Sequence, residues 1–164
     1  QWLGDHARIV RAMPNTPAKV GLGMTGLYAT AACETAQRDQ VDSLFAAVGE
    51  RIWVDTEAMI DAVTAVTGSG PGYVFYFMAA LEKAARELGF GAADARRLAV
   101  AAFRGAAELA AGDDAALTEL QDRVTSKGGT TYAALTHLRE AGVAQAITEA
   151  ALKAEQRARE LSAG

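Results

Sequence analysis

An abrupt change in residue pattern near Glu57 constrains the fold of this chain more than any other feature. Before Glu57, β-like runs surround a single helical pattern, whereas only helical patterns separated by glycine or polar breaks follow it. Strands mixed with a helix are typical of an α/β domain, and helices alone are typical of an all-helical domain. The sequence therefore predicts a mainly α chain of two parts, residues 1–56 and residues 57–164.

The first part reads as three strands and one helix. Pro14 ends the first strand, because proline cannot donate to a strand ladder, and Gly49 ends the helix. The chain opens on a short polar piece before a strand, and its first residue is Gln1 rather than methionine. We therefore expect a fragment or a processed chain. The expected strands are Ala7–Met13, Thr25–Thr30 and Arg51–Val54, and the expected helix is Glu34–Val48.

The first long helix of the second part begins at a clear start signal. Ser69 precedes the helix, Pro71 occupies its first turn, and Gly89 ends it. Its first half, Tyr73–Leu81, is apolar on all sides, so we expect it to be buried against a second chain. A central core helix in a monomer is the alternative. Further helices are expected over Asp94–Ala111, around Leu117–Val124, around Tyr132–Leu138 and over Val143–Leu161.

The stretch Gly21–Gly26, GLGMTG, spells the G-x-G-x-x-G of a dinucleotide fingerprint. That fingerprint requires a strand before the glycines, a helix directly after them, and an acidic residue roughly 20 residues further on for the ribose. Here a proline-bounded loop precedes the glycines, a β-like run follows them, and Asp39 and Asp42 fall within a helical pattern. We interpret the stretch as a glycine-rich turn entering a strand, and we expect this chain alone to bind no nicotinamide cofactor tightly.

The most informative stretch for function is Val124–Leu135, VTSKGGTTYAAL. Two glycines let the backbone approach a ligand, hydroxyl groups offer neutral donors and acceptors, and the stretch leads into a helix whose first amides are unpaired. With Lys127 close by, such a helix start favours a small carboxylate. The alternative is a two-glycine helix link with a threonine as N-cap. The hydroxyl-bearing residues are Ser126, Thr130 and Thr131.

Charge and composition exclude other classes of function. The net charge is −4 and the basic residues form no stripe, so we expect no nucleic acid partner. No apolar run reaches the length of a membrane span. The single cysteine, Cys33, cannot form an internal disulfide and fits a reducing cytoplasm. His6 and His137 lie far apart, and no residue spacing supports a metal site or a His/Cys/Asp catalytic constellation.

Three longer motifs follow one another along the chain: RAMPNTPAKVGLGMTGLY from Arg11, DAVTAVTGSGPGYVF from Asp61, and VTSKGGTTYAAL from Val124. In this order and spacing they closely resemble pyrroline-5-carboxylate reductase, the enzyme family that makes proline. The resemblance covers essentially the whole chain. It implies a Rossmann domain that binds NADH or NADPH, followed by an all-helical domain that intertwines with a partner's domain to form dimers or larger rings.

Within that family, this chain resembles the last strands and helix of the Rossmann-type α/β domain, residues 1–56, followed by the helical substrate-binding and dimerisation domain, residues 57–164. The resemblance also implies roles for particular residues. Met13, Pro14, Asn15 and Thr16 match a loop near the nicotinamide, and Thr64 and Ser69 match a helical motif that lines the substrate pocket.

The family's S-x-G-G-T-T element holds the carboxylate of the cyclic imine. It corresponds to Ser126, Gly128, Gly129, Thr130 and Thr131. Thr131 matches the position proposed to hydrogen-bond the ring nitrogen, which makes it the implied catalytic residue. Lys127 departs from the proline of many relatives, so we expect a less rigid and more cationic loop.

The implied reaction moves a hydride from the nicotinamide to the C=N carbon of 1-pyrroline-5-carboxylate and gives L-proline in a cytoplasmic homo-oligomer. The imine nitrogen is basic enough to arrive protonated, so the site needs positioning more than a strong acid. One alternative is another Rossmann-plus-helical reductase, of the hydroxyacid or imine type, that uses a lysine as acid; Lys83, Lys127 and Lys153 are the choices. The other alternative is a helical dimerisation module without catalysis.

Overall fold

The computed structural model describes residues 4 and 6–162, and the chain divides into two compact units. The first, here called the strand unit, comprises Gln1–Gly72 and Glu149–Gly164. The second, the helical unit, comprises Tyr73–Thr148. This division follows compactness alone, so the domain boundary expected after residue 56 stays a prediction.

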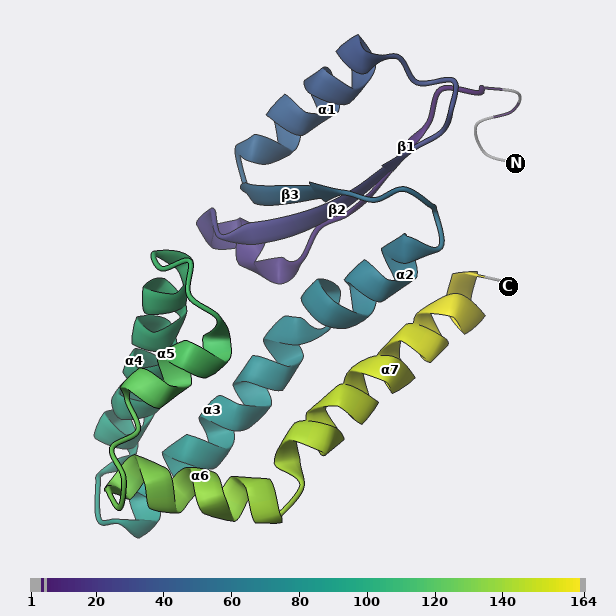
Figure 1. Ribbon diagram of the computed structural model, residues 1–164. Coiled ribbons are helices and arrows are strands. Elements are labelled where there is room, and N and C mark those ends of the chain that lie inside the picture. The colour runs from purple at the N-terminus through teal and green to yellow at the C-terminus, as the bar shows by residue number, and fades with distance from the viewer. Residues whose placement is uncertain (1–3, 5, 163–164) are drawn as a thin grey trace. The chain divides into compact units, whose positions relative to one another are not determined.

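The strand unit is built on a three-stranded sheet in the order β1-β2-β3. Strand β2 pairs antiparallel with β1 and parallel with β3. Helix α1 connects the parallel pair and packs against β3 on one face of the sheet, while α2 contacts β1 and β2 on the other (Figure 1). The predicted strands and helix are therefore confirmed to within a few residues. Their bounds are β1 Val10–Met13, β2 Gly23–Ala29, β3 Gly49–Trp53, α1 Thr35–Ala46 and α2 Met59–Val63.

The glycines of the GLGMTG stretch serve the sheet. Gly21 has a φ of 75°, in the left-handed region that favours glycine, and it ends a short 3-10 helix. Gly23 opens β2, and Gly26 lies within β2, where a Cβ atom would stand 2.6 Å from Val63 Cγ1. No helix follows the glycines, so they present no helix N-terminus to a pyrophosphate. The interpretation as a turn that enters a strand is confirmed.

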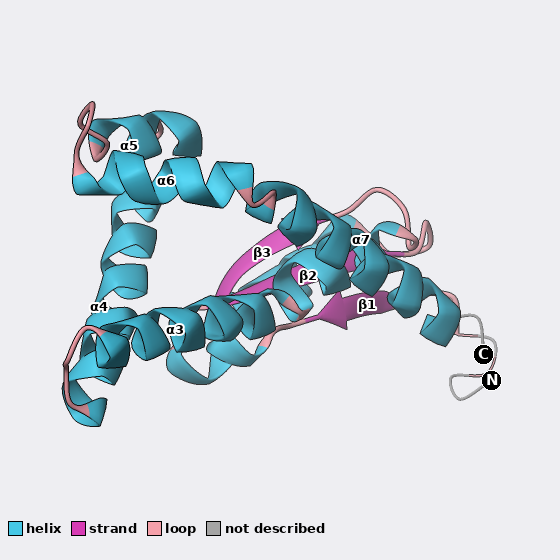
Figure 2. Ribbon diagram, turned by 90° about the horizontal axis from the view of Figure 1, so that it is seen from below, coloured by secondary structure: helices cyan, strands magenta, loops and turns pink. Residues whose placement is uncertain are grey.

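Every regular element after β3 in the described part of the chain is helical (Figure 2). The mainly α character expected from the sequence is confirmed. A π-helical turn directly follows α2 and leads into α3, a detail that the residue pattern did not predict. None of these helices is long and apolar enough to cross a membrane. The elements are the π-turn η2 Thr64–Gly68, α3 Gly70–Glu87, α4 Ala92–Ala111, α5 Leu117–Arg123, α6 Thr130–Glu140 and α7 Val143–Ser162.

The strand unit has a small apolar core with a buried carboxylate, Asp61, beside it. Leu27 and Ile60 are its largest fully buried apolar side chains. Buried Asp61 accepts a hydrogen bond from Ser162 Oγ at 3.0 Å, and its Oδ1 lies 3.7 Å from Arg11 Nη2. A buried carboxylate needs such partners to offset its loss of hydration. The contacts link α2 to the end of α7 and to β1.

The helical unit buries few large side chains of its own. Its most buried apolar residues are alanines, among them Ala85, Ala95 and Ala99. On α3, by contrast, the side chains of Phe75 and Tyr76 are 65% and 75% exposed. Contiguous exposed apolar surface of this kind often marks an interaction site.

Candidate functional site

The chain leaves β1 through a short loop that begins with a proline. Pro14 follows the strand, Asn15 adopts an extended conformation (φ −114°, ψ 169°), and the 3-10 helix η1, Thr16–Val20, begins at once. The side chains of Pro14 and Thr16 are exposed, whereas Met13 and Asn15 are half-buried. The loop therefore offers two side chains to a ligand and turns the other two toward the protein.

The π-helical turn carries the second group of predicted residues. The N–H of Ser69 donates to the carbonyl of Thr64 at 2.8 Å, which closes the wider π turn. Thr64 Oγ1 donates to the carbonyl of Ile60 at 2.8 Å, so its donor is used inside the helix and its acceptor lone pairs remain. Such π turns occur frequently at functional sites.

The structure brings this turn and the loop after β1 together. Asn15 Nδ2 donates to the carbonyl of Thr67 at 3.0 Å. A Cβ atom on Gly68 would lie 3.2 Å from Met13 Cε and 3.6 Å from Thr64 Cγ2, so Met13 and Thr64 flank the bare face of this glycine. The predicted cofactor loop and the predicted substrate-lining turn are thus neighbours within the strand unit.

The third group lies in the helical unit, in the loop between α5 and α6. The N–H of Gly129 donates to the carbonyl of Ser126 at 3.0 Å, and Gly128 has a φ of 75° inside this turn. Gly129 is the N-cap of α6, and no side chain caps the helix. The alternative of a threonine N-cap is therefore wrong. Ser126 Oγ lies over Gly129, where a Cβ atom would stand only 2.5 Å from it.

The hydroxyls of this loop differ from their neighbours in what they bond. Thr125 Oγ1 donates to the carbonyl of Gln121 at 2.6 Å, and Thr136 Oγ1 donates to that of Tyr132 at 2.9 Å. Thr130 and Thr131 stand in the first turn of α6, where no preceding helical carbonyl exists for such a bond. Two hydroxyls and the uncapped amides of a helix start therefore lie together, an arrangement that suits a small anion.

Few other groups in the described part of the chain suggest catalysis. Residues 4 and 6–162 contain no cluster of His, Cys, Asp and Glu that could hold a metal ion. The thiol of Cys33 is buried and donates to the carbonyl of Ile9 at 3.3 Å. Hydrogen bonds from Arg51 and Trp53 lower the pKa of Asp42, and this cluster joins α1 to β3.

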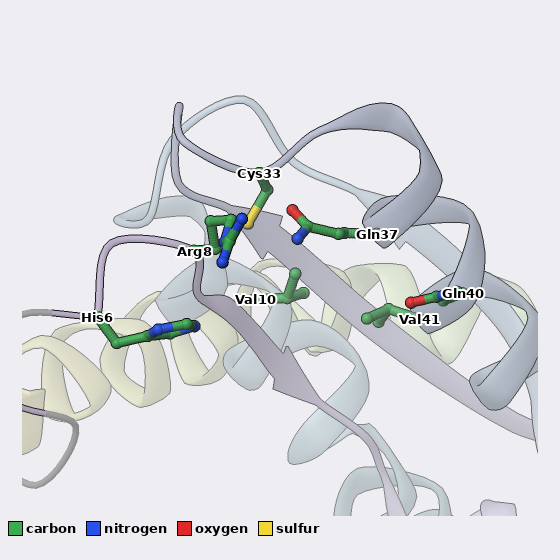
Figure 3. Close-up of a pocket in the computed structure, with 7 residues that line it drawn as sticks. All are labelled: His6, Arg8, Val10, Cys33, Gln37, Gln40 and Val41. Atoms are coloured by element: carbon green, nitrogen blue, oxygen red, sulfur yellow. The ribbon is translucent and has the colours of Figure 1, made fainter.

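The structure also contains a pocket that no sequence pattern indicated. It has a volume of about 350 Å³ and lies between the start of β1 and helix α1 (Figure 3). His6, Arg8, Cys33 and Gln37 are among its lining residues. None of these residues belongs to a predicted site, and their spacing in the sequence carries no recognisable motif.

Comparison with known protein sequences gives a consistent result. A sequence profile described as pyrroline-5-carboxylate reductase dimerisation matches residues 57–161. The pyrroline-5-carboxylate reductase of Pseudomonas aeruginosa is 44% identical over 161 residues, which cover 98% of this chain and 59% of that protein. The one of Synechocystis sp. is 43% identical over 157 residues, covering 96% of this chain and 58% of that protein.

Solved structures give the same picture. A pyrroline-5-carboxylate reductase from Coxiella burnetii superposes with a TM-score of 0.93 at 41% identity and covers 98% of this chain. The Plasmodium falciparum pyrroline carboxylate reductase, solved with NADP bound, superposes with a TM-score of 0.88 at 26% identity and covers 96% of this chain. These superpositions cover 59% and 63% of the two longer chains, so this chain spans less than two thirds of either.

Proposed function

This chain belongs to the pyrroline-5-carboxylate reductase family, and we propose that the complete protein reduces 1-pyrroline-5-carboxylate to L-proline with NADH or NADPH. The observation that carries this proposal is the loop before α6. It combines a left-handed glycine at Gly128, an uncapped helix N-terminus at Gly129 and the hydroxyls of Thr130 and Thr131. Such a site suits the carboxylate of a small acid.

In this proposal the loop binds the substrate carboxylate. The first amides of α6 carry the positive end of the helix dipole and donate hydrogen bonds to an anion without a dedicated arginine. The exposed Lys127 adds a positive charge beside them. Ser126, Gly128, Gly129 and Thr130 hold the carboxylate, and Thr131 is the residue that hydrogen-bonds the ring nitrogen.

The loop after β1 fits the reactive end of a nicotinamide. Pro14 and Thr16 present exposed side chains, while the two polar atoms of the Asn15 amide are bonded inside the protein. Contacts from Asn15 to a cofactor would therefore use its backbone. The phosphates do not fit here, because Gly23 and Gly26 are occupied in strand packing and Glu34 puts a carboxyl group at the start of α1.

The proposed reaction requires this chain mainly to position the substrate. A bound reduced nicotinamide supplies the hydride. The protonated imine of the substrate is already electrophilic, so the residues of the site need to orient it rather than to protonate it. Thr131 hydrogen-bonds the ring nitrogen and the α6 N-terminus binds the carboxylate, whereas Thr64 and Ser69 are the proposed substrate-lining residues of the strand unit. The absence of a His or Cys constellation in the sequence agrees with this division of labour.

We also propose that the protein is a homo-oligomer. The exposed Phe75 and Tyr76 lie within the residues matched by the dimerisation profile, and a second copy would remove their rings from water. The free thiol of Cys33 fits a reducing compartment, so we place the protein in the cytoplasm.

A lysine-dependent reductase is the first alternative. The side chain of Lys83 is exposed, and its Nζ forms an ion pair with Glu87 Oε1 at 3.3 Å along α3. Lys127 and Lys153 are exposed, and neither has an ion pair within the described residues. These surroundings do not resemble those of a desolvated lysine acid. A dimerisation module without catalysis is the second alternative.

An assay of the complete gene product distinguishes these three functions. Oxidation of NADH and NADPH is followed with 1-pyrroline-5-carboxylate, with an acyclic imine and with a 2-keto acid. The proposal requires turnover of the cyclic imine at a kcat/KM at least about 10⁴ M⁻¹s⁻¹, the lower end of the range for natural enzymes. Preference for a keto acid would support the first alternative, and the lack of any oxidation would support the second.

A further inference from the structure

The carbonyl of Thr67 cannot obtain its hydrogen bond from its own helix. In an α-helix it would accept from the residue four positions later, but that residue is Pro71, which has no N–H. The N–H five positions later, on Gly72, donates instead to Ser69 at 2.9 Å. A half-buried carbonyl without a partner would cost free energy. Asn15 Nδ2 supplies the missing donor at 3.0 Å.

The other polar atom of the same amide compensates for a second proline. Residues 10–13 pair with residues 29–26 in the antiparallel ladder of β1 and β2, and in this register Asn15 stands opposite Met24. Pro14 ends the ladder before that point. The N–H of Met24 donates to Asn15 Oδ1 at 2.9 Å and is satisfied by a side chain in place of a strand.

We propose that Asn15 is a positioning residue that fixes the spacing between the loop Met13–Thr16 and the turn Thr64–Ser69. One planar amide bonds two backbone segments, at Met24 and at Thr67, and Asn15 is the only asparagine in the sequence. The inference rests on the proposed function, in which the loop faces the nicotinamide and the turn faces the substrate. Asn15 then acts on hydride transfer through the distance between these segments, without touching the reacting atoms.

The amide is needed because one donor and one acceptor must sit on the same short side chain. Aspartate in its charged form keeps the acceptor for Met24 but turns a second oxygen toward the carbonyl of Thr67. Leucine has a similar size and keeps neither bond. Asn15→Asp therefore removes the hydrogen bond to the Thr67 carbonyl, and Asn15→Leu removes both hydrogen bonds.

Thr30 provides a matched control in the same unit. Its Oγ1 accepts from the N–H of Ile9 at 3.2 Å and donates to the carbonyl of Ala7 at 2.6 Å, so it also joins two backbone segments. It does so beside the opposite end of β1. Thr30→Val removes both bonds and keeps the side-chain shape, so it loosens the unit without touching the loop or the turn.

The experiment uses the complete protein and has two arms. In the first arm, kcat and KM are measured with 1-pyrroline-5-carboxylate. A misplacement of about 1 Å can cost up to about 100-fold in rate, so Asn15→Leu and Asn15→Asp should lower kcat at least about tenfold, with KM within about threefold. Thr30→Val should keep kcat within about twofold. Equal losses in Asn15→Leu and Thr30→Val would overturn the inference.

The second arm is hydrogen–deuterium exchange, which does not depend on the reaction. Peptides covering residues 64–72 should exchange at least tenfold faster in both Asn15 variants, whereas Met24 should lose protection only in Asn15→Leu. Thr30→Val should change neither segment. Unchanged exchange over residues 64–72 would overturn the inference. If the wild-type protein did not reduce the imine, the proposed function would fail, and this arm would still decide whether Asn15 couples the two segments.

Discussion

Asn15 Nδ2 donates a hydrogen bond to the carbonyl of Thr67, 52 positions further along the chain, at 3.0 Å. The contact joins the loop that follows β1 to the π-helical turn that precedes α3. Both segments were expected from the sequence to lie near the reacting groups, but no pattern in the sequence indicated that they are bonded to each other. This bond therefore links two segments that the sequence presents as separate motifs.

Thr131→Ala should lower kcat and leave the oligomer intact. Hydrogen bonds to charged groups contribute about 1.5–3 kcal/mol, so loss of the bond to the protonated ring nitrogen should slow turnover about 10- to 100-fold. Steady-state assays of NAD(P)H oxidation and light scattering give the two readouts. Thr136→Ala, on the same helix, removes a hydroxyl that bonds only within α6 and should change neither. An unchanged kcat in Thr131→Ala would remove Thr131 from the mechanism.

Gly129→Ala should weaken substrate binding. The added Cβ atom would stand 2.5 Å from Ser126 Oγ and 3.1 Å from the Ser126 carbonyl, so the loop must shift. Overpacking of this kind costs about 1–3 kcal/mol, and KM for the imine should rise roughly tenfold or more. Gly112→Ala is the control, because its Cβ atom would meet only the Glu108 carbonyl at an ordinary 3.6 Å. A KM equal in both variants would contradict the carboxylate role of the loop.

Substitution of Phe75 and Tyr76 by serine should dissociate the oligomer. Burial of a large apolar side chain contributes about 1.5–3 kcal/mol, and each dimer would lose four such rings, so the dissociation constant should rise at least about 100-fold. Sedimentation across a concentration series measures it. Leu44→Ser changes a side chain on α1 that is 68% exposed and should leave assembly unchanged. Dimers that persist in the double variant would place the interface elsewhere.

The contribution of Asp42 to stability should disappear in acid. Asp42 Oδ2 accepts from Arg51 Nη2 at 2.6 Å, and Oδ1 accepts from Trp53 Nε1 at 3.1 Å. These bonds lower the folded-state pKa of Asp42, so the native state binds this proton less readily than the unfolded state does. The stabilisation is therefore present above the ordinary carboxyl pKa of about 4 and is lost as the pH falls through the lower, folded-state value.

Urea unfolding of the wild type and of Asp42→Asn between pH 2 and pH 7 checks this direction. The difference in unfolding free energy should be constant near neutral pH and should vanish at the acidic end. Asp39→Asn makes the same charge change at an exposed position of α1 and should show a smaller difference. A difference in unfolding free energy between the wild type and Asp42→Asn that grows in acid would contradict the lowered pKa of Asp42.

Local patterns in the sequence were sufficient to predict most of the regular elements. Pro14 and Gly49 mark where a strand and a helix end, and both ends lie within a few residues of the predicted positions. The β-like run after the glycines was enough to show that GLGMTG is no dinucleotide fingerprint. That inference needed only the residues next to the motif. Three motifs in register were enough to indicate the family.

The missing details depend on contacts between distant residues. The π turn Thr64–Gly68 lies between α2 and Pro71. Its Thr67 carbonyl receives a hydrogen bond from Asn15 Nδ2. Periodicity cannot reveal such a bond, although the proline four positions after Thr67 marks a carbonyl that must find another donor. The N-cap of α6 is Gly129, one residue before the threonines, so the alternative of a threonine N-cap fails at a position that local residue preferences do not resolve.

Transfer of deuterium from the cofactor to the product tests the central claim most directly. The complete protein is incubated with 1-pyrroline-5-carboxylate and NADPH or NADH deuterated at C4 on the face that is transferred, each face being tried in turn. We predict L-proline with a single deuterium on the ring carbon that was doubly bonded to nitrogen, located by NMR and mass spectrometry. Proline without deuterium from either cofactor and either face, or no proline at all, would contradict the proposed reduction.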